Sequence, residues 1–126
     1  MKKKIISTEN APAAIGPYSQ AVEVNGMLFL SGMLAIDPAK GDLVAGGVSE
    51  QTTQIFTNIR AVLAVAGVTT EQIVKTTVFL QDMSLFGEMN EVYAAQFNGS
   101  FPARSAFAVK ELPKQALVEI EVIAVR

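Results

Sequence analysis

The stretch "ALVEIEVIAV", residues 116–125, alternates two kinds of position and decides how the chain can fold. Its odd positions are mixed and include Glu119 and Glu121. Its even positions are all apolar, namely Ala116, Val118, Ile120, Val122 and Ala124. Successive side chains of a β-strand point to opposite faces of a sheet, so the even positions form one apolar face. We expect this face to pack against helices, and we expect the mixed face to be covered by another subunit.

A second stretch, "FPARSAFAV" at residues 101–109, holds a single arginine among small and apolar residues. Arg104 either extends its charged head to solvent or an acidic partner, or it lies in a recess that its small neighbours leave open. In a recess, the planar guanidinium is a good receptor for a carboxylate. Glu119 and Glu121 are roughly 6 to 7 Å apart on one face of their strand. They either balance a cation at an interface, or one of them holds a water molecule and transfers a proton.

The remaining segments predict an α+β domain over residues 1–126, in the order ββ(β)αβαββ. A short strand at 4–7 precedes a hairpin over 21–32, whose Asn25-Gly26 pair favours a type I′ turn. Residues 35–47 are typical of a surface loop. Helices are expected over 49–66 and 84–97, capped by Ser49 and Ser84, with strands at 74–82, 104–109 and 116–125. Right-handed crossovers place both helices on the same face of a mixed sheet.

The composition excludes several kinds of chemistry. The 126 residues contain no cysteine and no histidine, which excludes disulfides, thiol nucleophiles and Ser-His-Asp triads and argues against a zinc site. The net charge of −2 indicates no affinity for nucleic acid. No apolar run is long enough to span a membrane, and the basic start lacks the apolar core of a signal peptide. We therefore expect a cytoplasmic protein that binds neither nucleic acid nor membranes.

Six segments together resemble the reactive intermediate deaminase family, also called the Rid or YjgF family. They are "APAAIGPYSQ", "FLSGM", "VKTTVFLQDM", "MNEVYAAQF", "FPARSA" and "LPKQALVEIEVIAV". The resemblance implies a chorismate-mutase-like fold that assembles as a homotrimer around a central barrel. It also implies hydrolysis of 2-imino acids, such as 2-iminobutanoate and 2-iminopropanoate, to 2-oxo acids and ammonia. Such imines arise from pyridoxal-phosphate enzymes, and no cofactor or metal is implied for the hydrolysis.

The resemblance also assigns roles to residues of this chain. Arg104 matches the arginine that binds the substrate carboxylate, and Glu119 matches the glutamate that positions the hydrolytic water. Four further positions match residues that line the substrate pocket: Tyr18, Gly32, Asn90 and Ala106. Many relatives have cysteine at the position of Ala106 and glutamine at that of Met33. If the contact at the first position is a backbone N–H, which is the interpretation we favour, alanine preserves it, whereas a role of the thiol would be lost. Methionine makes the entrance of the pocket less polar and bears on substrate preference.

A second class of function stays open from the sequence. The same interface cleft could serve a regulator without enzymatic activity that binds a 2-oxo acid or docks a partner protein. A water-positioning glutamate favours the enzyme, because a docking protein has no need of one. A chorismate mutase and a nuclease are weaker alternatives, and the negative charge disfavours the nuclease.

Overall fold

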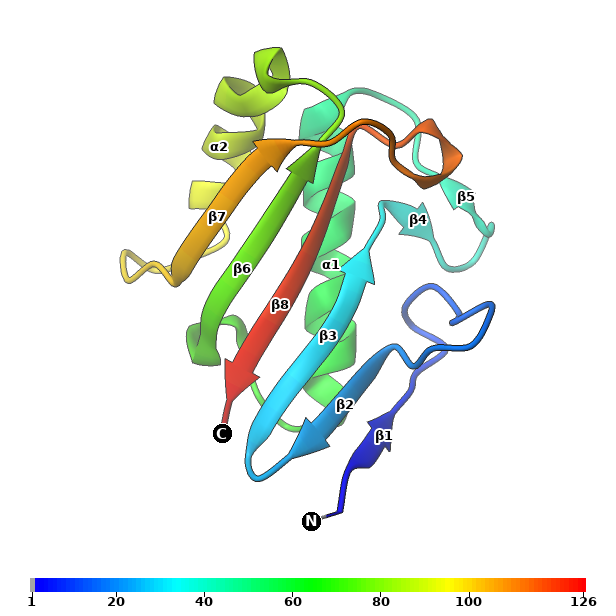
Figure 1. The fold of residues 1–126 in the computed structure, drawn as a ribbon, viewed down its shortest axis with the longest axis vertical. Coiled ribbons are helices and arrows are strands. Elements are labelled where there is room, and N and C mark those ends of the chain that lie inside the picture. The colour runs from blue at the N-terminus through cyan, green and yellow to red at the C-terminus, as the bar shows by residue number, and fades with distance from the viewer. Residues whose placement is uncertain (1) are drawn as a thin grey trace.

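A computed structural model describes residues 2–126, which form one six-stranded sheet, a small two-stranded sheet and two α-helices (Figure 1). The large sheet has the strand order β1-β2-β3-β8-β6-β7. Its strands are β1 (Lys4–Ile6), β2 (Ala21–Val24), β3 (Met27–Met33), β6 (Ile73–Leu80), β7 (Ala103–Ala108) and β8 (Val118–Val125). Only β6 and β7 pair in parallel, and the other neighbours are antiparallel. The sheet is therefore mixed, as the sequence predicts.

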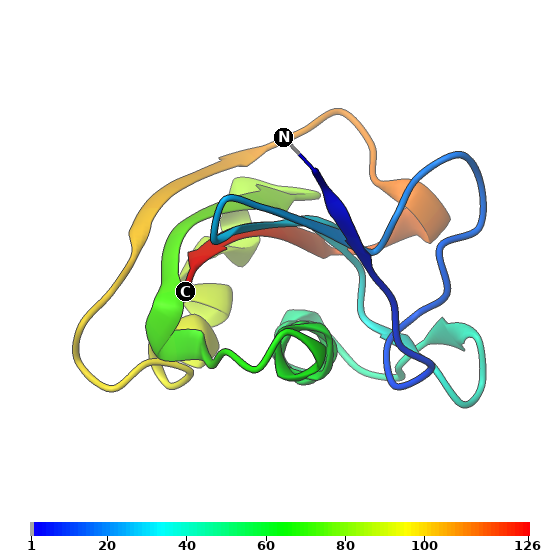
Figure 2. The ribbon, with the colours of Figure 1, turned by 90° about the horizontal axis from the view of Figure 1, so that it is seen from below.

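Both helices lie on the same side of the sheet, which arches over them in Figure 2. Helix α1 (Val48–Val65) connects the β3 side of the fold to β6, and α2 (Phe86–Ala94) connects β6 to its parallel neighbour β7. Three short 3-10 helices lie at Thr70–Gln72, Met83–Leu85 and Pro113–Gln115. The predicted α+β class and the placement of both helices on one face are confirmed. No helix within residues 2–126 is long and apolar enough to cross a membrane.

The core forms between the helices and the even positions of β8. The four even residues of β8 and Ala116, which lies just before the strand, are at most 2% exposed, and together they are the five that the alternation selects. From α1, the fully buried residues Ile55, Phe56, Ile59, Val62 and Leu63 belong to the same cluster. Since β8 lies between β3 and β6, its apolar face occupies the middle of the sheet. Burial of such side chains stabilises the fold by roughly 1.5 to 3 kcal/mol each.

The hairpin between β2 and β3 has the predicted turn. Asn25 and Gly26 both have positive φ, at 51° and 78°, as a type I′ turn requires. Arg126 supports this hairpin by donating its backbone N–H to the Gly26 carbonyl and by forming an ion pair with Glu23.

The helix ends differ from the sequence-based expectations. Helix α1 begins at Val48, after Gly47 instead of Ser49, because the Glu50 carboxylate accepts a hydrogen bond from the Gly47 N–H at 2.8 Å. Ser84 caps no helix; Asp82 accepts its N–H and starts the 3-10 turn that precedes α2. Helix α2 ends at Ala94, three residues before Phe97. The expected loop at 35–47 contains a small hairpin of two strands with two residues each, β4 (Ile36–Asp37) and β5 (Asp42–Leu43).

We predict that Asn58→Ala lowers the free energy of unfolding by about 2 kcal/mol. Asn58 is fully buried in α1, and its amide donates to the carbonyls of Leu34 and Ile36 at 3.2 and 2.9 Å. Without the amide, both acceptors lose their partner. Urea unfolding monitored by circular dichroism measures the change. The exposed neighbour Thr57→Ala is the control and should change stability by less than about 0.5 kcal/mol. Equal effects of the two variants would contradict this role of Asn58.

Candidate functional site

Arg104 lies on β7, an edge strand of the sheet, and its side chain points to the helix side. Its register partner on β6 is Thr76, which is fully buried against the helices. The Arg104 guanidinium donates a hydrogen bond to the Asn90 amide oxygen of α2 at 2.7 Å. Both residues line a surface pocket together with Tyr93, Ala94, Phe101 and Pro102. Arg104 is therefore half-buried in a recess, as one of its two sequence-based interpretations expected.

No carboxylate of residues 2–126 forms an ion pair with Arg104, since the ion pair found there joins Arg126 to Glu23. Ala106 follows two positions later on the same face of β7 and is half-buried. An arginine held by an amide keeps donors free for an incoming anion. Arg104, Asn90 and Ala106 thus form one group on the helix side of the sheet.

Glu119 lies on the opposite face of the sheet. Its neighbours in the strand, Val118 and Ile120, are fully buried on the helix side, so Glu119 points to the open face. Burial raises the pKa of the Glu119 carboxyl above its usual range, and the negative charge of Glu121 raises this pKa further. A raised pKa means that the carboxylate is a stronger base, and therefore a better proton acceptor.

Gly32 provides the space that Glu119 occupies. A β-carbon at position 32 would lie 2.0 Å from a carboxylate oxygen of Glu119, so the carboxylate packs directly on the glycine backbone. A register shift between Leu30 and Met33 places an extra residue in β3 at this point. Leu30 and Met33 are both buried, whereas Gly32 is exposed, so the bulge turns the glycine toward the open face.

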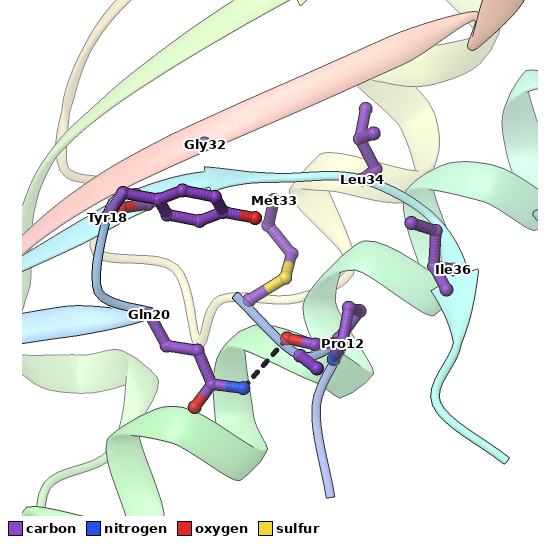
Figure 3. A pocket seen from close by; sticks show the side chains of 9 residues that line it. Pro12, Tyr18, Gln20, Gly32, Met33, Leu34 and Ile36 are labelled. Atoms are coloured by element: carbon purple, nitrogen blue, oxygen red, sulfur yellow. Dashed lines mark hydrogen bonds between the residues drawn. The ribbon is translucent and has the colours of Figure 1, made fainter. Parts of the chain in front are cut away.

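Tyr18 lies on the loop before β2 and faces a pocket beside Gly32 (Figure 3). The pocket is lined by Pro12, Ala13, Tyr18, Gln20, Ser31, Gly32, Met33, Leu34 and Ile36. Met33 is 6% exposed and lies below the Tyr18 ring in Figure 3, so the expected apolar lining is present at this position. Tyr18 itself is 53% exposed. Tyr18, Gly32 and Glu119 form a second group, distinct from that of Arg104.

Sequence reasoning missed the residue that holds the Tyr18 loop. Gln20 is 6% exposed, and its side chain donates to the carbonyls of Thr8 and Pro12 and accepts from the Thr8 N–H. One of these bonds is drawn in Figure 3. A glutamine directly before an alternating strand and after a Gly-Pro loop was the available signal. Through these bonds Gln20 fixes the path of residues 8–12, and Pro12 at the end of this segment lines the pocket.

The structure therefore brings the expected site residues together in two groups. Arg104, Asn90 and Ala106 lie on the helix side of β7, and Tyr18, Gly32 and Glu119 lie around the end of β3 and on the open face. Arg104 and Glu119 extend from opposite faces of one sheet, so they do not meet within one protomer. The fold and these groups define an α+β protein with two separate groups of candidate site residues.

Comparison with known proteins identifies the family. The model of the endoribonuclease L-PSP family matches residues 8–126, and the chain belongs to this family, which is also known as Rid or YjgF. A mouse protein named 2-iminobutanoate/2-iminopropanoate deaminase is 51% identical over 98% of this chain and 92% of its own. A RutC family protein of Pyrococcus horikoshii is 50% identical over 97% of both chains.

Solved structures agree with this assignment. A Rid family protein of Yersinia pestis, described as of unknown function, has a TM-score of 0.96 and 52% identity, over 99% of this chain and 100% of that one. TdcF of Escherichia coli, solved with bound serine, has a TM-score of 0.93 and 41% identity over 98% of both chains. The resemblance stated from the six sequence segments is confirmed.

We predict that Gly32→Ala lowers any activity that depends on Glu119 about a hundredfold, because the new methyl group must displace the carboxylate by more than about 1 Å. The backbone of Gly32 does not have positive φ, so alanine itself is not strained there. Gly87→Ala, which meets no atom within 4 Å, is the control and should leave activity unchanged. Steady-state kinetics and thermal melts of both variants check this. Full activity of Gly32→Ala would contradict the placement of Glu119.

Proposed function

We propose that this protein hydrolyses reactive 2-imino acids, such as 2-iminobutanoate and 2-iminopropanoate, to 2-oxo acids and ammonia. Relatives named 2-iminobutanoate/2-iminopropanoate deaminase, from mouse, cattle and human, are 45 to 53% identical over 98% of the chain. The serine bound to TdcF supports this substrate class, because serine has the same carboxylate next to a carbon that carries nitrogen. By removing such imines in the cytoplasm, the protein protects pyridoxal-phosphate enzymes.

The observation that carries the proposal is a pair of unmatched charges. Arg104 lies in a recess without an ion-pair partner among residues 2–126, and Glu119 is also without a cationic partner there. The first group suits the carboxylate, the one feature that all 2-imino acids share. The second suits the proton that a water molecule loses as it attacks.

In the proposed reaction, Arg104 binds the carboxylate of a protonated imine, and Asn90 holds the guanidinium through its amide oxygen. Glu119 accepts a proton from a water molecule as the water oxygen bonds to C2. Glu119 returns this proton to the nitrogen of the tetrahedral intermediate. As the C–N bond breaks, Glu119 accepts the proton of the hydroxyl group and passes it to the departing ammonia. The sum is one iminium and one water giving one 2-oxo acid and one ammonium ion. Because an iminium is already electrophilic, positioning and one proton-transfer group suffice.

The two halves of the site combine only if a second protomer contributes one of them. We therefore propose a homotrimer in which the helix side of β7 in one protomer meets the Gly32–Glu119 region of the next, around a central barrel. The open sheet face supports this assembly, since Met27, Phe29 and Phe107 are 38 to 45% exposed there. Lys75 and Glu121 on the same face provide both charges for contacts between identical copies. An apolar surface of this kind favours association over exposure.

In this cleft, Tyr18, Gly32, Asn90 and Ala106 line the substrate. Gly32 leaves room for the Glu119 carboxylate, and Tyr18 covers the apolar pocket beside it. Ala106 contributes its backbone N–H to the carboxylate, so its missing thiol costs no contact. The proposed chemistry uses neither a cofactor nor a metal.

We predict that Glu119→Gln abolishes hydrolysis while keeping the affinity for a 2-oxo acid, because Arg104 still binds the carboxylate while the water loses its proton acceptor. Ammonia release in a threonine dehydratase reaction measures the first effect, and calorimetric titration with 2-oxobutanoate measures the second. Glu121→Gln is the matched control and should remain active. An inactive Glu121→Gln beside an active Glu119→Gln would show that the roles of the two glutamates are reversed. If the wild type binds 2-oxobutanoate but never accelerates ammonia release, the protein is a regulator instead.

We predict that Arg104→Lys lowers kcat/KM by about one to two orders of magnitude, because lysine keeps the charge but loses the bidentate geometry. The mass from light scattering should stay that of a trimer. A trimer with undiminished activity would refute the carboxylate receptor, and dissociation would make Arg104 a structural residue.

Mixed trimers separate the shared site from a site within one protomer. Co-expressing equal amounts of Arg104→Lys and Glu119→Gln should restore about a quarter of wild-type activity. About three quarters of the trimers are then mixed, and each mixed trimer has both intact side chains in one of its three clefts. Native mass spectrometry confirms that mixing has occurred. Mixed trimers without recovered activity would contradict the shared cleft.

A further inference from the structure

Three residues of α2 surround the Arg104 guanidinium, and two of them are aromatic. The central carbon of the guanidinium lies 4.7 Å from the centre of the Tyr93 ring and 5.4 Å from that of the Phe86 ring. The third residue, Asn90, accepts its hydrogen bond. Positions 86, 90 and 93 are four and three residues apart, so they share one face of the helix. All three neighbours are neutral.

Tyr93 is itself held in place. Its hydroxyl forms a 2.7 Å hydrogen bond with the hydroxyl of Thr76, and its ring packs against Phe56 and Phe97 with centroids 5.6 and 5.1 Å away. The residue is 4% exposed. Burial raises the pKa of the Tyr93 hydroxyl, although Thr76 and the charge of Arg104 act in the opposite direction. The phenol is therefore neutral at physiological pH and adds no negative charge beside Arg104.

We propose that Phe86 and Tyr93 are positioning residues, which hold the Arg104 guanidinium in place for the substrate carboxylate without neutralising its charge. This inference rests on the proposed function of Arg104. A cation near the face of an aromatic ring is attracted to it, and the ring offers no acceptor that competes for the N–H donors. An acidic residue in the same place would hold the arginine as firmly, but its carboxylate would occupy the N–H donors that the substrate carboxylate needs.

The clamp, defined as Phe86 and Tyr93, also lowers the entropy that carboxylate binding costs. A free arginine side chain loses rotamer freedom when it binds a ligand, whereas a clamped one has lost it on folding. The benefit applies equally to the bound substrate and to the transition state, because the carboxylate does not change during hydrolysis. Loss of the clamp should therefore raise KM and leave kcat nearly unchanged.

Phe86→Leu is the test, since Phe86 is only half-buried at the start of α2 and leucine keeps most of its packing. We expect KM for 2-iminobutanoate to rise about three- to fivefold with kcat unchanged. Phe86→Tyr restores the ring and should restore KM. Val92→Ala, which removes packing from the same helix away from Arg104, is the matched control and should leave KM unchanged.

Nuclear magnetic resonance provides a readout that needs no activity. The order parameter of the Arg104 Nε–H bond should be high in the unliganded wild type and in Phe86→Tyr, and it should fall in Phe86→Leu. An unchanged order parameter overturns the clamp, and so does a loosened arginine with an unchanged KM. If the wild type shows no deaminase activity, the proposed function fails, whereas the order parameters still decide whether the rings position Arg104.

Discussion

The fold depends on the alternation of side chains along β8. This strand lies between β3 and β6, and its four even residues provide the middle of the core against which α1 packs. Because the period of a strand is two residues, the same geometry that buries Val118 and Ile120 turns Glu119 to the other face. A slip of one residue in register would bury both glutamates and expose the core. The position of the candidate base is thus fixed by the same constraint that stabilises the protein.

The architecture could be predicted from the sequence because its signals are local and repeated. The alternation in β8, the Asn25-Gly26 turn and the apolar stripe of α1 each specify an element without reference to the rest of the chain. The helix ends could not be predicted as well, because several residues compete for each cap. Glu50 reaches back to Gly47, and Asp82 takes the N–H of Ser84, so the nearest serine is not the cap in either case.

The candidate site was predictable as a set of residues and not as an arrangement. The resemblance named Arg104, Glu119 and the four lining residues. That Arg104 and Glu119 point to opposite faces of the sheet follows only when the alternation of side chains along β7 and β8 is combined with the register of these strands on β6. The bulge at Gly32 also depends on the pairing of β3 with β8, which no local pattern contains. Gln20 and the rings around Arg104 were missed because their roles depend on contacts distant in the sequence.

The contact between Gly32 and Glu119 has a consequence for anyone who wishes to diversify this scaffold in the laboratory. Position 32 accepts no β-carbon unless the Glu119 carboxylate moves, so every clone of a library that randomises it would also displace the candidate base. The neighbouring wall is different: Leu34 and Ile36 line the pocket with half-buried apolar side chains that other sizes can replace, whereas Met33 belongs to the core. The glycine that must be kept and the side chains that can be changed thus lie close together, within residues 32–36. New substrate preferences are therefore best sought at positions 34 and 36, with the glycine left untouched.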